Sequence, residues 1–244
     1  MMRRGFRCRN QIADLLKNIY EDEIHNTYNG NYLLGLENFY DIAEYKLRKF
    51  LQEKYISQTS IDQSWKSCKG ELYEYAVYKF LTNTISKHEK YGGILSIHRG
   101  SEIINEQNND LAIKNWNDIY PDLDLVLREN NKKILAIFSC KTSLRERLTE
   151  TAFWKRELQQ FSHLKDIKFI FVTTDRDEEL RAETNRYIIL HIIDYTLITE
   201  PQRYFSIMKF YEKKFGNRSD FKILQKKVRP IKDFITVLQE LMSG

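Results

Sequence analysis

The sequence predicts a mixed α/β protein, in which a mixed sheet is flanked by helices and preceded by an N-terminal helical subdomain. Apolar residues recur at helical spacing through the first sixty residues and again over residues 69–81. From residue 123 the pattern changes to short apolar runs separated by polar turns, which is typical of strands. The chain has 244 residues, of which 42% are hydrophobic, so one large domain with its own core is expected.

Two helices are expected at the N-terminus. The apolar stripe of the first one is formed by Ile12, Leu15, Leu16, Ile19 and Tyr20. A turn-like segment at 26–31 separates it from a longer helix with an apolar face over residues 36–51. A second turn-rich stretch at 57–64 ends this part of the chain. Residues 1–62 are therefore predicted to form a helical subdomain within one composite domain.

The core is predicted in residues 63–244 and includes a helix over residues 69–81. That helix is apolar over most of its circumference, so it is expected to be substantially buried. Glu74 lies between its apolar rows, where a carboxylate is costly unless a cation meets it. An arginine or a bound metal ion would each supply that cation.

A β-hairpin, a helix and two further strands are predicted next. Leu123–Leu127 and Ile134–Phe138 form the hairpin, which a polar turn closes. A helix over Thr149–Phe161 follows, and the apolar runs Ile167–Val172 and Tyr187–Ile193 are predicted as strands. Helices complete the chain, and the last part is basic.

The predicted hairpin brings acidic residues close to a lysine. Every second side chain of a strand shares a face, so Asp122 and Asp124 point the same way, as do Ser139 and Lys141. Carboxylates hold a hard divalent cation such as Mg²⁺, which accepts phosphate oxygens. A lysine can orient or help deprotonate the attacking water and offset negative charge on the phosphorane. With a further carboxylate from a helix, this arrangement suits phosphodiester hydrolysis.

Basic residues are concentrated near the C-terminus. The formal net charge is only +5, yet residues 212–232 contain eight basic and two acidic residues. Such a stretch can lie along a phosphate backbone, or it can be a solvated helix face.

Several classes of protein are disfavoured by the sequence. No apolar run approaches the roughly 18 residues of a membrane helix, and no apolar segment follows the basic N-terminus, so neither a membrane nor a secretory location is expected. Cys8, Cys68 and Cys140 are far apart and lack histidines at ligand spacing. This spacing argues against structural zinc and against disulfides, and it favours the cytoplasm. No phosphate-binding Gly-x-x-x-x-Gly-Lys-(Ser/Thr) loop is present, which leaves an ATP-driven enzyme unsupported.

The hairpin residues resemble the core motif of the PD-(D/E)xK nucleases. Pro121-Asp122-x-Asp124 is similar to its first part and Ser139-Cys140-Lys141 to its second, although Ser139 stands where the second acid is expected. Restriction endonucleases that cut CCGG-type sites resemble this arrangement, because they have a Ser-x-Lys strand and take the missing acid from a following helix. The resemblance covers roughly residues 70–175 and implies a PD-(D/E)xK restriction-endonuclease-like fold.

A candidate for reading bases follows the lysine. The CCGG-cutting enzymes carry an Arg-(Asp/Glu)-Arg segment there, and this chain has Arg145-Glu146-Arg147, beginning four positions after Lys141. Arginine donates bidentately to guanine O6 and N7, and a carboxylate accepts from cytosine N4. We name Arg145-Glu146-Arg147 the base-reading segment and expect it to contact DNA together with Ser143. The alternative interpretation is a surface ion-pair cluster.

The acid that completes the metal shell is left open between two glutamates. Where the CCGG-cutting enzymes have their helical glutamate, this chain has Trp154 and Lys155, and Glu157 follows about one turn later. Glu74 is the competitor and is slightly favoured. It follows Gly70 in a pattern that resembles an early core helix of the wider nuclease superfamily.

Asp124 is expected to be the principal acid rather than Asp122. In this core the acid usually directly precedes the hydrophobic strand residues, and Leu125-Val126-Leu127 follow Asp124. The literal Pro121-Asp122 pair is the argument for Asp122.

The resemblance implies a sequence-specific, Mg²⁺-dependent double-stranded DNA endonuclease of the type II restriction class. It implies that the catalytic residues come from Asp124, Lys141, Glu74, Asp122, Glu157 and Ser139, and the metal ligands from Asp124, Glu74 and Glu157. Cleavage would leave 5′-phosphates at a short palindromic site containing C and G, which a homodimer matches by its twofold symmetry. The class also implies a cognate DNA methyltransferase on a separate chain.

Two other functions stay open. A repair or junction-resolving nuclease with the same core needs no base-reading segment, and a non-catalytic DNA-binding protein needs no active hairpin. The sequence specifies neither the recognition sequence nor the cleavage stagger.

Overall fold

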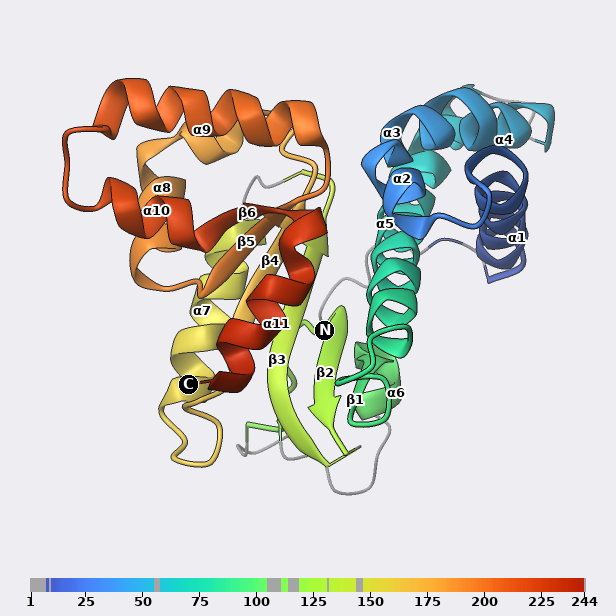
Figure 1. Ribbon diagram of the computed structural model, residues 1–244. Helices are drawn as coiled ribbons and strands as arrows, with labels where there is room; N and C mark the ends of the chain where they lie inside the picture. The colour runs from blue at the N-terminus through green and yellow to red at the C-terminus, as the bar shows by residue number, and fades with distance from the viewer. Residues whose placement is uncertain are drawn as a thin grey trace. The chain divides into compact units, whose positions relative to one another are not determined.

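The computed structural model describes residues 8, 10–54, 58–104, 111–113, 119–130, 132–143 and 147–243. The chain forms two compact units, which divide between Phe80 and Leu81 inside one long helix (Figure 1). The division predicted after residue 62 falls near the start of that helix, and it stays a prediction. In the described part of the chain, no helix combines the length and apolar character needed to span a bilayer.

The N-terminal unit is helical. Its elements are α1 (Asn10–Tyr28), α2 (Tyr32–Glu37), α3 (Phe39–Asp41), the π-helix η1 (Ile42–Leu47), α4 (Arg48–Lys54) and most of α5 (Gln58–Ser86). The turn predicted after the first helix is confirmed at Asn29 and Gly30, whose φ angles of 53° and 73° end α1. The turn-rich stretch predicted at 57–64 is wrong from Gln58 onward, because those residues open α5.

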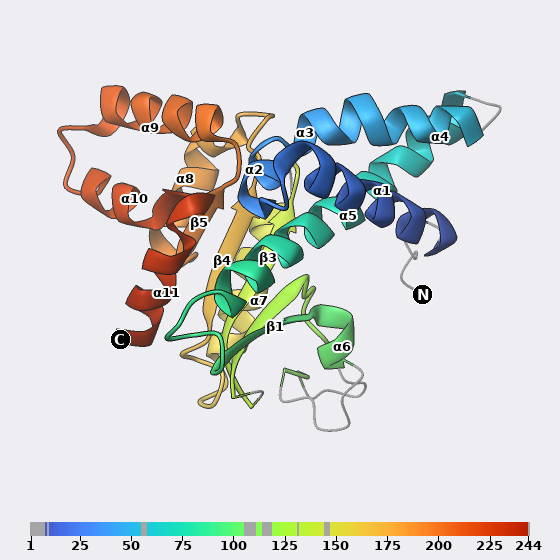
Figure 2. The ribbon, with the colours of Figure 1, turned by 45° about the vertical axis from the view of Figure 1, so that its right-hand side comes forward.

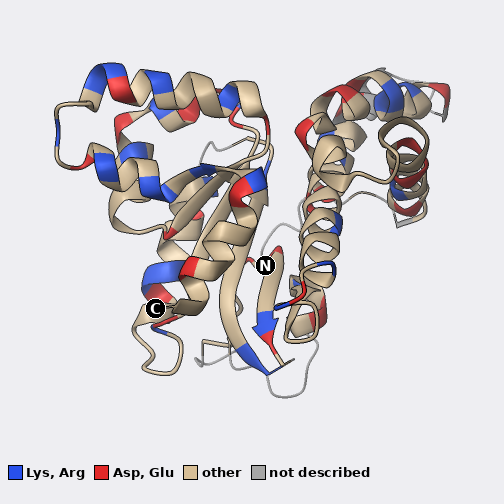
Figure 3. Ribbon diagram, in the orientation of Figure 1, with Lys and Arg blue, Asp and Glu red and all other residues tan. Residues whose placement is uncertain are grey.

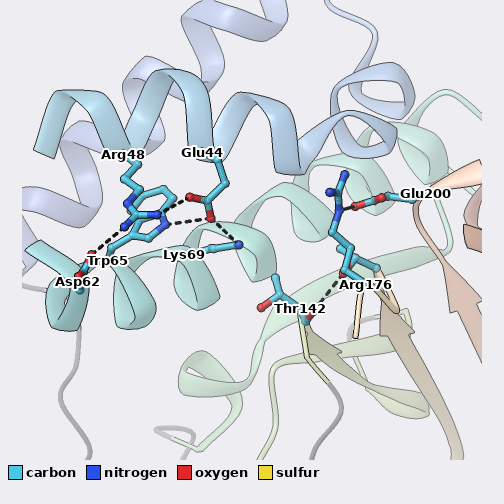
Figure 4. A network of polar contacts seen from close by, with 9 residues as sticks. Glu44, Arg48, Asp62, Trp65, Lys69, Thr142, Arg176 and Glu200 are labelled. Atoms are coloured by element: carbon cyan, nitrogen blue, oxygen red, sulfur yellow. Dashed lines mark hydrogen bonds and ion pairs between the residues drawn. The ribbon is translucent and has the colours of Figure 1, made fainter. Parts of the chain in front are cut away.

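Aromatic packing and one polar network hold the N-terminal unit together. The ring of Phe39 lies 5.1 Å from that of Tyr73 on α5, and both side chains are fully buried. Glu44 on η1 accepts hydrogen bonds from Trp65 Nε1 at 3.1 Å and Lys69 Nζ at 2.6 Å (Figure 4). Glu44 therefore joins the π-helix to α5 with a charge-assisted contact.

A disulfide joins Cys8 to Cys68 of α5, so the prediction that the cysteines stay unpaired is wrong. The two residues are 60 positions apart, and only the packing of the helical unit brings them together. Cys140 is a free thiol and is buried. The cytoplasmic location stays a prediction.

The second unit contains a six-stranded mixed sheet. Its strands are β1 (Leu95–Arg99), β2 (Leu125–Glu129), β3 (Lys133–Lys141), β4 (Lys168–Thr173), β5 (Tyr195–Ile198) and β6 (Val228–Pro230), in that spatial order. The pairs β1–β2 and β2–β3 are antiparallel, and β3–β4, β4–β5 and β5–β6 are parallel. The register pairs Lys141 with Thr173, so the carboxyl ends of β3 and β4 lie side by side.

Helices cover both faces of this sheet (Figures 1 and 2). They are α6 (Gly100–Ile104), α7 (Arg147–Gln159), η2 (Glu179–Arg181), α8 (Glu183–His191), α9 (Pro201–Phe215), α10 (Phe221–Lys227), η3 (Ile231–Asp233) and α11 (Phe234–Ser243). Successive residues of β3 face opposite layers: the Phe138 ring lies 6.1 Å from that of Phe234 on α11, whereas Ser139 meets Thr151 on α7. The catalytic candidates on β3 therefore lie on the α7 side.

The mixed α/β class is confirmed, as are the hairpin β2–β3, the helix α7 and the strand β4. The strand predicted at Tyr187–Ile193 is wrong, because that run lies mostly in α8 and the strand follows at Tyr195. A short, fully apolar run does not distinguish a buried helix from a buried strand, and Ile188, Ile189 and Leu190 are all buried in the helix. The strand β1 is an addition to the predicted sheet.

Candidate active site

The antiparallel hairpin brings Asp124 and Lys141 into direct contact. Asp124 directly precedes β2, and Lys141 is the last residue of β3. Lys141 Nζ lies 2.9 Å from both carboxylate oxygens of Asp124. The backbone N–H of Cys140 donates to Asp124 Oδ2 at 2.6 Å and fixes the carboxylate against the strand. The hairpin therefore brings the acidic side chain and the lysine together, as the sequence predicts.

Asp122 is the second carboxylate of this group. Its Oδ2 lies 3.3 Å from Lys141 Nζ, and its side chain is 45% exposed, against 9% for Asp124. Asp124 thus forms the buried, oriented part of the site, and Asp122 forms the part that faces solvent. The choice of Asp124 as the principal acid stays a prediction.

Two carboxylates share one ammonium, and the pKa values reflect this excess of negative charge. Burial raises the pKa of Asp124, and the charge of Asp122 adds to the shift against the opposing effect of Lys141. Burial alone would lower the pKa of Lys141, but the charges of Asp124 and Asp122 outweigh it and raise that pKa above its ordinary value. Lys141 is therefore an ammonium at neutral pH.

The same oxygen donors fit a hard divalent cation. Asp122 and Asp124 present carboxylate oxygens beside each other, and their charge exceeds that of Lys141 by one. No three His, Cys, Asp or Glu side chains gather as a metal site among the residues that the structure describes. A third acidic ligand is thus not identified by these contacts.

Ser139 lies on the same side of β3 and contacts α7. The hydroxyls of Ser139 and Thr151 are hydrogen-bonded to each other at 3.1 Å, and both residues are buried. Thr151 also donates to the backbone carbonyl of Arg147 at 3.0 Å. Ser139 therefore anchors the first turns of α7 to β3.

The face of α7 toward β3 carries Thr151 and a buried lysine. One turn after Thr151 it carries Lys155, which is buried and pairs with Asp194. Glu157 is half-buried and accepts a hydrogen bond from Gln160 Nε2 at 3.2 Å. Glu74 is half-buried on α5 in the N-terminal unit. The metal-ligand roles of Glu157 and Glu74 both stay predictions.

The base-reading segment is described only in part. Arg145 and Glu146 lie outside the described residues. Arg147 opens α7, where its guanidinium is 54% exposed and lies 3.1 Å from Glu150. Ser143 donates through Oγ to Asp177 Oδ2 at 2.7 Å.

Asp177 and Thr174 are polar neighbours of the active strand that the sequence analysis missed. They follow β4, whose carboxyl end lies beside that of β3. The sequence does indicate these residues, because the polar run Thr173–Glu179 directly follows an apolar strand. Ligands of α/β sheets bind beyond the carboxyl ends of parallel strands, which makes such a run a candidate.

The basic stretch at 212–232 has two kinds of residue. Lys227 donates to the carbonyls of Leu190 at 2.9 Å and Ile193 at 2.8 Å, and Arg229 pairs with Glu240 at 3.3 Å. Those two side chains stabilise the fold. The exposed ones on and around α9 and α10 are Lys213, Lys214, Arg218, Lys222, Lys226 and Lys232 (Figure 3). Their contact with phosphate stays a prediction.

A further buried carboxylate, Asp175, lies just after β4. Its Oδ1 accepts from the backbone N–H of Leu180 at 3.1 Å. Burial raises the pKa of Asp175 to about 7, and the negative charge of Asp177 adds to the shift. Asp175 is therefore partly protonated at neutral pH.

We expect Asp175→Asn to be more stable than the wild type at pH 8 by about 2 to 4 kcal/mol. Below about pH 7 the folded protein keeps a proton on Asp175, whereas the unfolded chain loses it near the ordinary pKa of 3.8. The free energy of unfolding of the wild type therefore falls as the pH rises through this range. Asparagine keeps the acceptor for Leu180 and carries no charge. Urea unfolding of both proteins at pH 5 and pH 8 measures the effect, and an equal difference at the two pH values would contradict it.

The fold and the site together define a nuclease: a mixed sheet flanked by helices, with two aspartates and a lysine at the ends of an antiparallel hairpin. Residues 100–224, slightly more than half of the chain, match the family described as BsaWI restriction endonuclease type 2. This chain belongs to that family, and it is a type II site-specific deoxyribonuclease. The match includes Asp122, Asp124, Ser139 and Lys141, whereas Glu74 lies outside it.

Relatives and solved structures agree with this assignment. The chain is 25% identical over 173 residues to "Putative type II restriction enzyme MjaVIP" of Methanocaldococcus jannaschii, which covers 62% of this chain and 75% of that protein. It is 47% identical over 60 residues to "Probable type II restriction enzyme HpyAORF263P" of Helicobacter pylori, covering 23% of this chain and 31% of that protein. Its fold is similar to restriction endonuclease PspGI in a complex with substrate DNA, with a TM-score of 0.62, 17% identity and 93% of each chain covered.

Proposed function

We propose that this chain is a Mg²⁺-dependent endonuclease that cuts double-stranded DNA at a short palindromic site containing C and G. The observation that carries the proposal is the contact of Lys141 Nζ with Asp124, at 2.9 Å, beside the exposed carboxylate of Asp122. These residues lie within the part of the chain that matches the restriction endonuclease family. The presence of substrate DNA in the PspGI structure supports DNA as the partner.

Asp122 and Asp124 would hold the metal ion, because carboxylate oxygens suit Mg²⁺. The ammonium of Lys141 balances only one of the two carboxylate charges, so one negative charge remains for the cation. We propose Glu74 or Glu157 as the third acidic ligand. When bound, Mg²⁺ supplies Lewis-acid stabilisation of the phosphate oxygens and lowers the pKa of a water molecule.

Lys141 acts in this proposal as a cation. The charges of the two aspartates raise its pKa, so it is an ammonium at neutral pH in the metal-free protein. Its ammonium can orient the attacking water, or the lysine can help to deprotonate that water, and its positive charge offsets the negative charge that develops on the phosphorane. In-line attack by that water would leave a 5′-phosphate. Ser139 is hydrogen-bonded to Thr151 and so stabilises the position of α7 on the sheet face that carries the lysine.

Specificity is proposed to come from the base-reading segment, with Ser143 beside it. A palindromic site matches a homodimer, since one short segment then reads both half-sites. We propose a cytoplasmic location and a cognate DNA methyltransferase on a separate chain. The methyltransferase follows from the class of enzyme.

The test is incubation of the purified protein with plasmid and phage DNA, with and without Mg²⁺, followed by sequencing of the ends. We expect discrete fragments with 5′-phosphate ends, formed only when Mg²⁺ is present. Cleavage without a preferred sequence would favour a repair or junction-resolving nuclease. DNA binding with no cleavage in the presence of Mg²⁺ would favour a non-catalytic DNA-binding protein.

A further inference from the structure

The loop after β4 is hydrogen-bonded to Thr142 and Ser143, the two residues that follow Lys141. Thr174 donates through Oγ1 to the backbone carbonyl of Thr142 at 3.0 Å. Ser143 donates through Oγ to the carboxylate of Asp177 at 2.7 Å, a short distance that is typical of a charge-assisted hydrogen bond. Each of the two residues after the catalytic lysine thus has its own contact with this loop.

The loop is itself fixed in a specific conformation. Asp175 and Glu178 have left-handed backbone angles, with φ of 50° and 55°, which are unfavourable for residues with a side chain unless their surroundings enforce them. The Asp175 carboxylate accepts from the N–H of Leu180 at 3.1 Å, which closes the turn between them. Local strain of this kind tends to occur at functional sites, where the surrounding contacts maintain it.

Ion pairs connect the loop to the start of α9. Glu178 lies 2.9 Å from Arg203, and Arg176 lies 2.5 Å from Glu200 (Figure 4). Glu200 is 7% exposed, so its pair with Arg176 is fixed at the base of the loop. The loop is therefore a rigid support and not a free surface segment.

The two residues that contact the loop connect the catalytic lysine to the base-reading segment. Thr142 and Ser143 lie in the sequence between the catalytic Lys141 and the base-reading segment that begins at Arg145. A shift of this segment would move the base-reading side chains relative to the lysine. Small displacements of binding groups cost specificity and rate, because recognition and chemistry both depend on fixed geometry.

We propose that Asp177 is a positioning residue for base recognition, which acts through Ser143 to fix the chain two residues before the base-reading segment begins. The proposal rests on the proposed function, since it needs a nuclease with a preferred site. Asp177 does not touch the reacting atoms in it. Its loss should reduce the discrimination between the preferred site and altered sites more than it reduces the cleavage rate.

The experiment compares Asp177→Ala, Ser143→Ala and the double variant. For each, kcat and KM are measured on the preferred site and on sites with one base pair changed, and the midpoint of urea unfolding is recorded. The Ser143–Asp177 hydrogen bond is exposed, and such a bond is worth about threefold in an equilibrium, so Asp177→Ala should lose about threefold in discrimination and Ser143→Ala at least as much. The double variant should lose no more than Ser143→Ala alone, because Asp177 acts only through Ser143 in this proposal, whereas Ser143 is also expected to contact DNA.

Glu179→Gln is the matched control for charge. It removes one negative charge from the same turn, and Glu179 has no contact with Ser143 among the described interactions. It should keep the discrimination of the wild type. Asp177→Asn retains an acceptor oxygen for Ser143 and should keep most of the discrimination as well. The midpoints of unfolding should change little, because the Ser143–Asp177 contact is exposed.

Three results would overturn the proposal: unchanged discrimination in Asp177→Ala, additive losses in the double variant, or an equal loss in Glu179→Gln. Each of these leaves the wild-type nuclease with its preferred site intact. A wild-type protein that cuts no discrete site would instead overturn the proposed function, and this inference with it. The two failures are therefore distinguishable in the same set of assays.

Discussion

Lys141→Met is expected to lose DNA cleavage by about a thousandfold or more while it still binds DNA. Methionine has a similar length and no charge, so the variant removes the ammonium that lies 2.9 Å from Asp124 and would offset the charge on the phosphorane. Single-turnover cleavage and gel-shift binding on the same duplex separate the two effects. Wild-type cleavage by this variant would contradict the assigned role.

The chain offers a matched control in its other buried lysine. Lys155 on α7 pairs with Asp194 as Lys141 pairs with Asp124, and both lysines are largely buried. Lys155→Met should destabilise the protein by up to about 3 kcal/mol, because it removes the closer of the two lysines that pair with a mostly buried aspartate. The folded fraction should nevertheless cleave DNA normally. A loss of cleavage in both variants would indicate that the defect of Lys141→Met is one of folding.

Asp124→Asn is expected to abolish cleavage to a similar extent, by about a thousandfold, together with Mg²⁺ binding. The amide can still accept from the N–H of Cys140, so the hairpin should keep its structure, but it removes one of the two described carboxylates near Lys141. Titration calorimetry with Mg²⁺ and cleavage assays over a range of Mg²⁺ concentrations measure the loss. Asp122→Asn, at the exposed position, should weaken Mg²⁺ binding less.

Asp194→Asn serves as the control for Asp124→Asn. Asp194 accepts from the N–H of Phe169 at 2.8 Å and pairs with Lys155, so it reproduces the contacts of Asp124 away from the catalytic hairpin. Its variant should retain Mg²⁺-dependent cleavage. Equal loss of activity in the two variants would argue that Asp124 has a structural role only.

The central contact of the site was predictable from local rules. Alternation along a strand makes Asp122 and Asp124 point the same way, and it does the same for Ser139 and Lys141 on the neighbouring strand; a short hairpin then brings the two pairs together. The strand β4 and the helix α7 were also predictable, because their apolar patterns are long and bounded by polar residues. Both inferences depend on residues that are close in the sequence.

Other features depended on contacts between distant parts of the chain. The run Tyr187–Ile193 is apolar enough for a strand. It lies mostly in the helix α8, which packs against α7 and α10, and that packing is not visible in the local sequence. The pairing of Cys8 with Cys68 depends on the fold of the helical unit. The ion pair of Lys155 with Asp194 was equally unpredictable from the sequence, because the two residues lie 39 positions apart.

By itself, the sequence determined the class of fold and the acid–lysine pair of the hairpin, since side-chain alternation and turn closure are local properties of the backbone. Only the tertiary structure decided that Asp177 meets Ser143, 34 residues away. That contact requires the parallel register of β3 against β4, and the helix α7 separates these two strands in the sequence, so their pairing is not a local property of the chain.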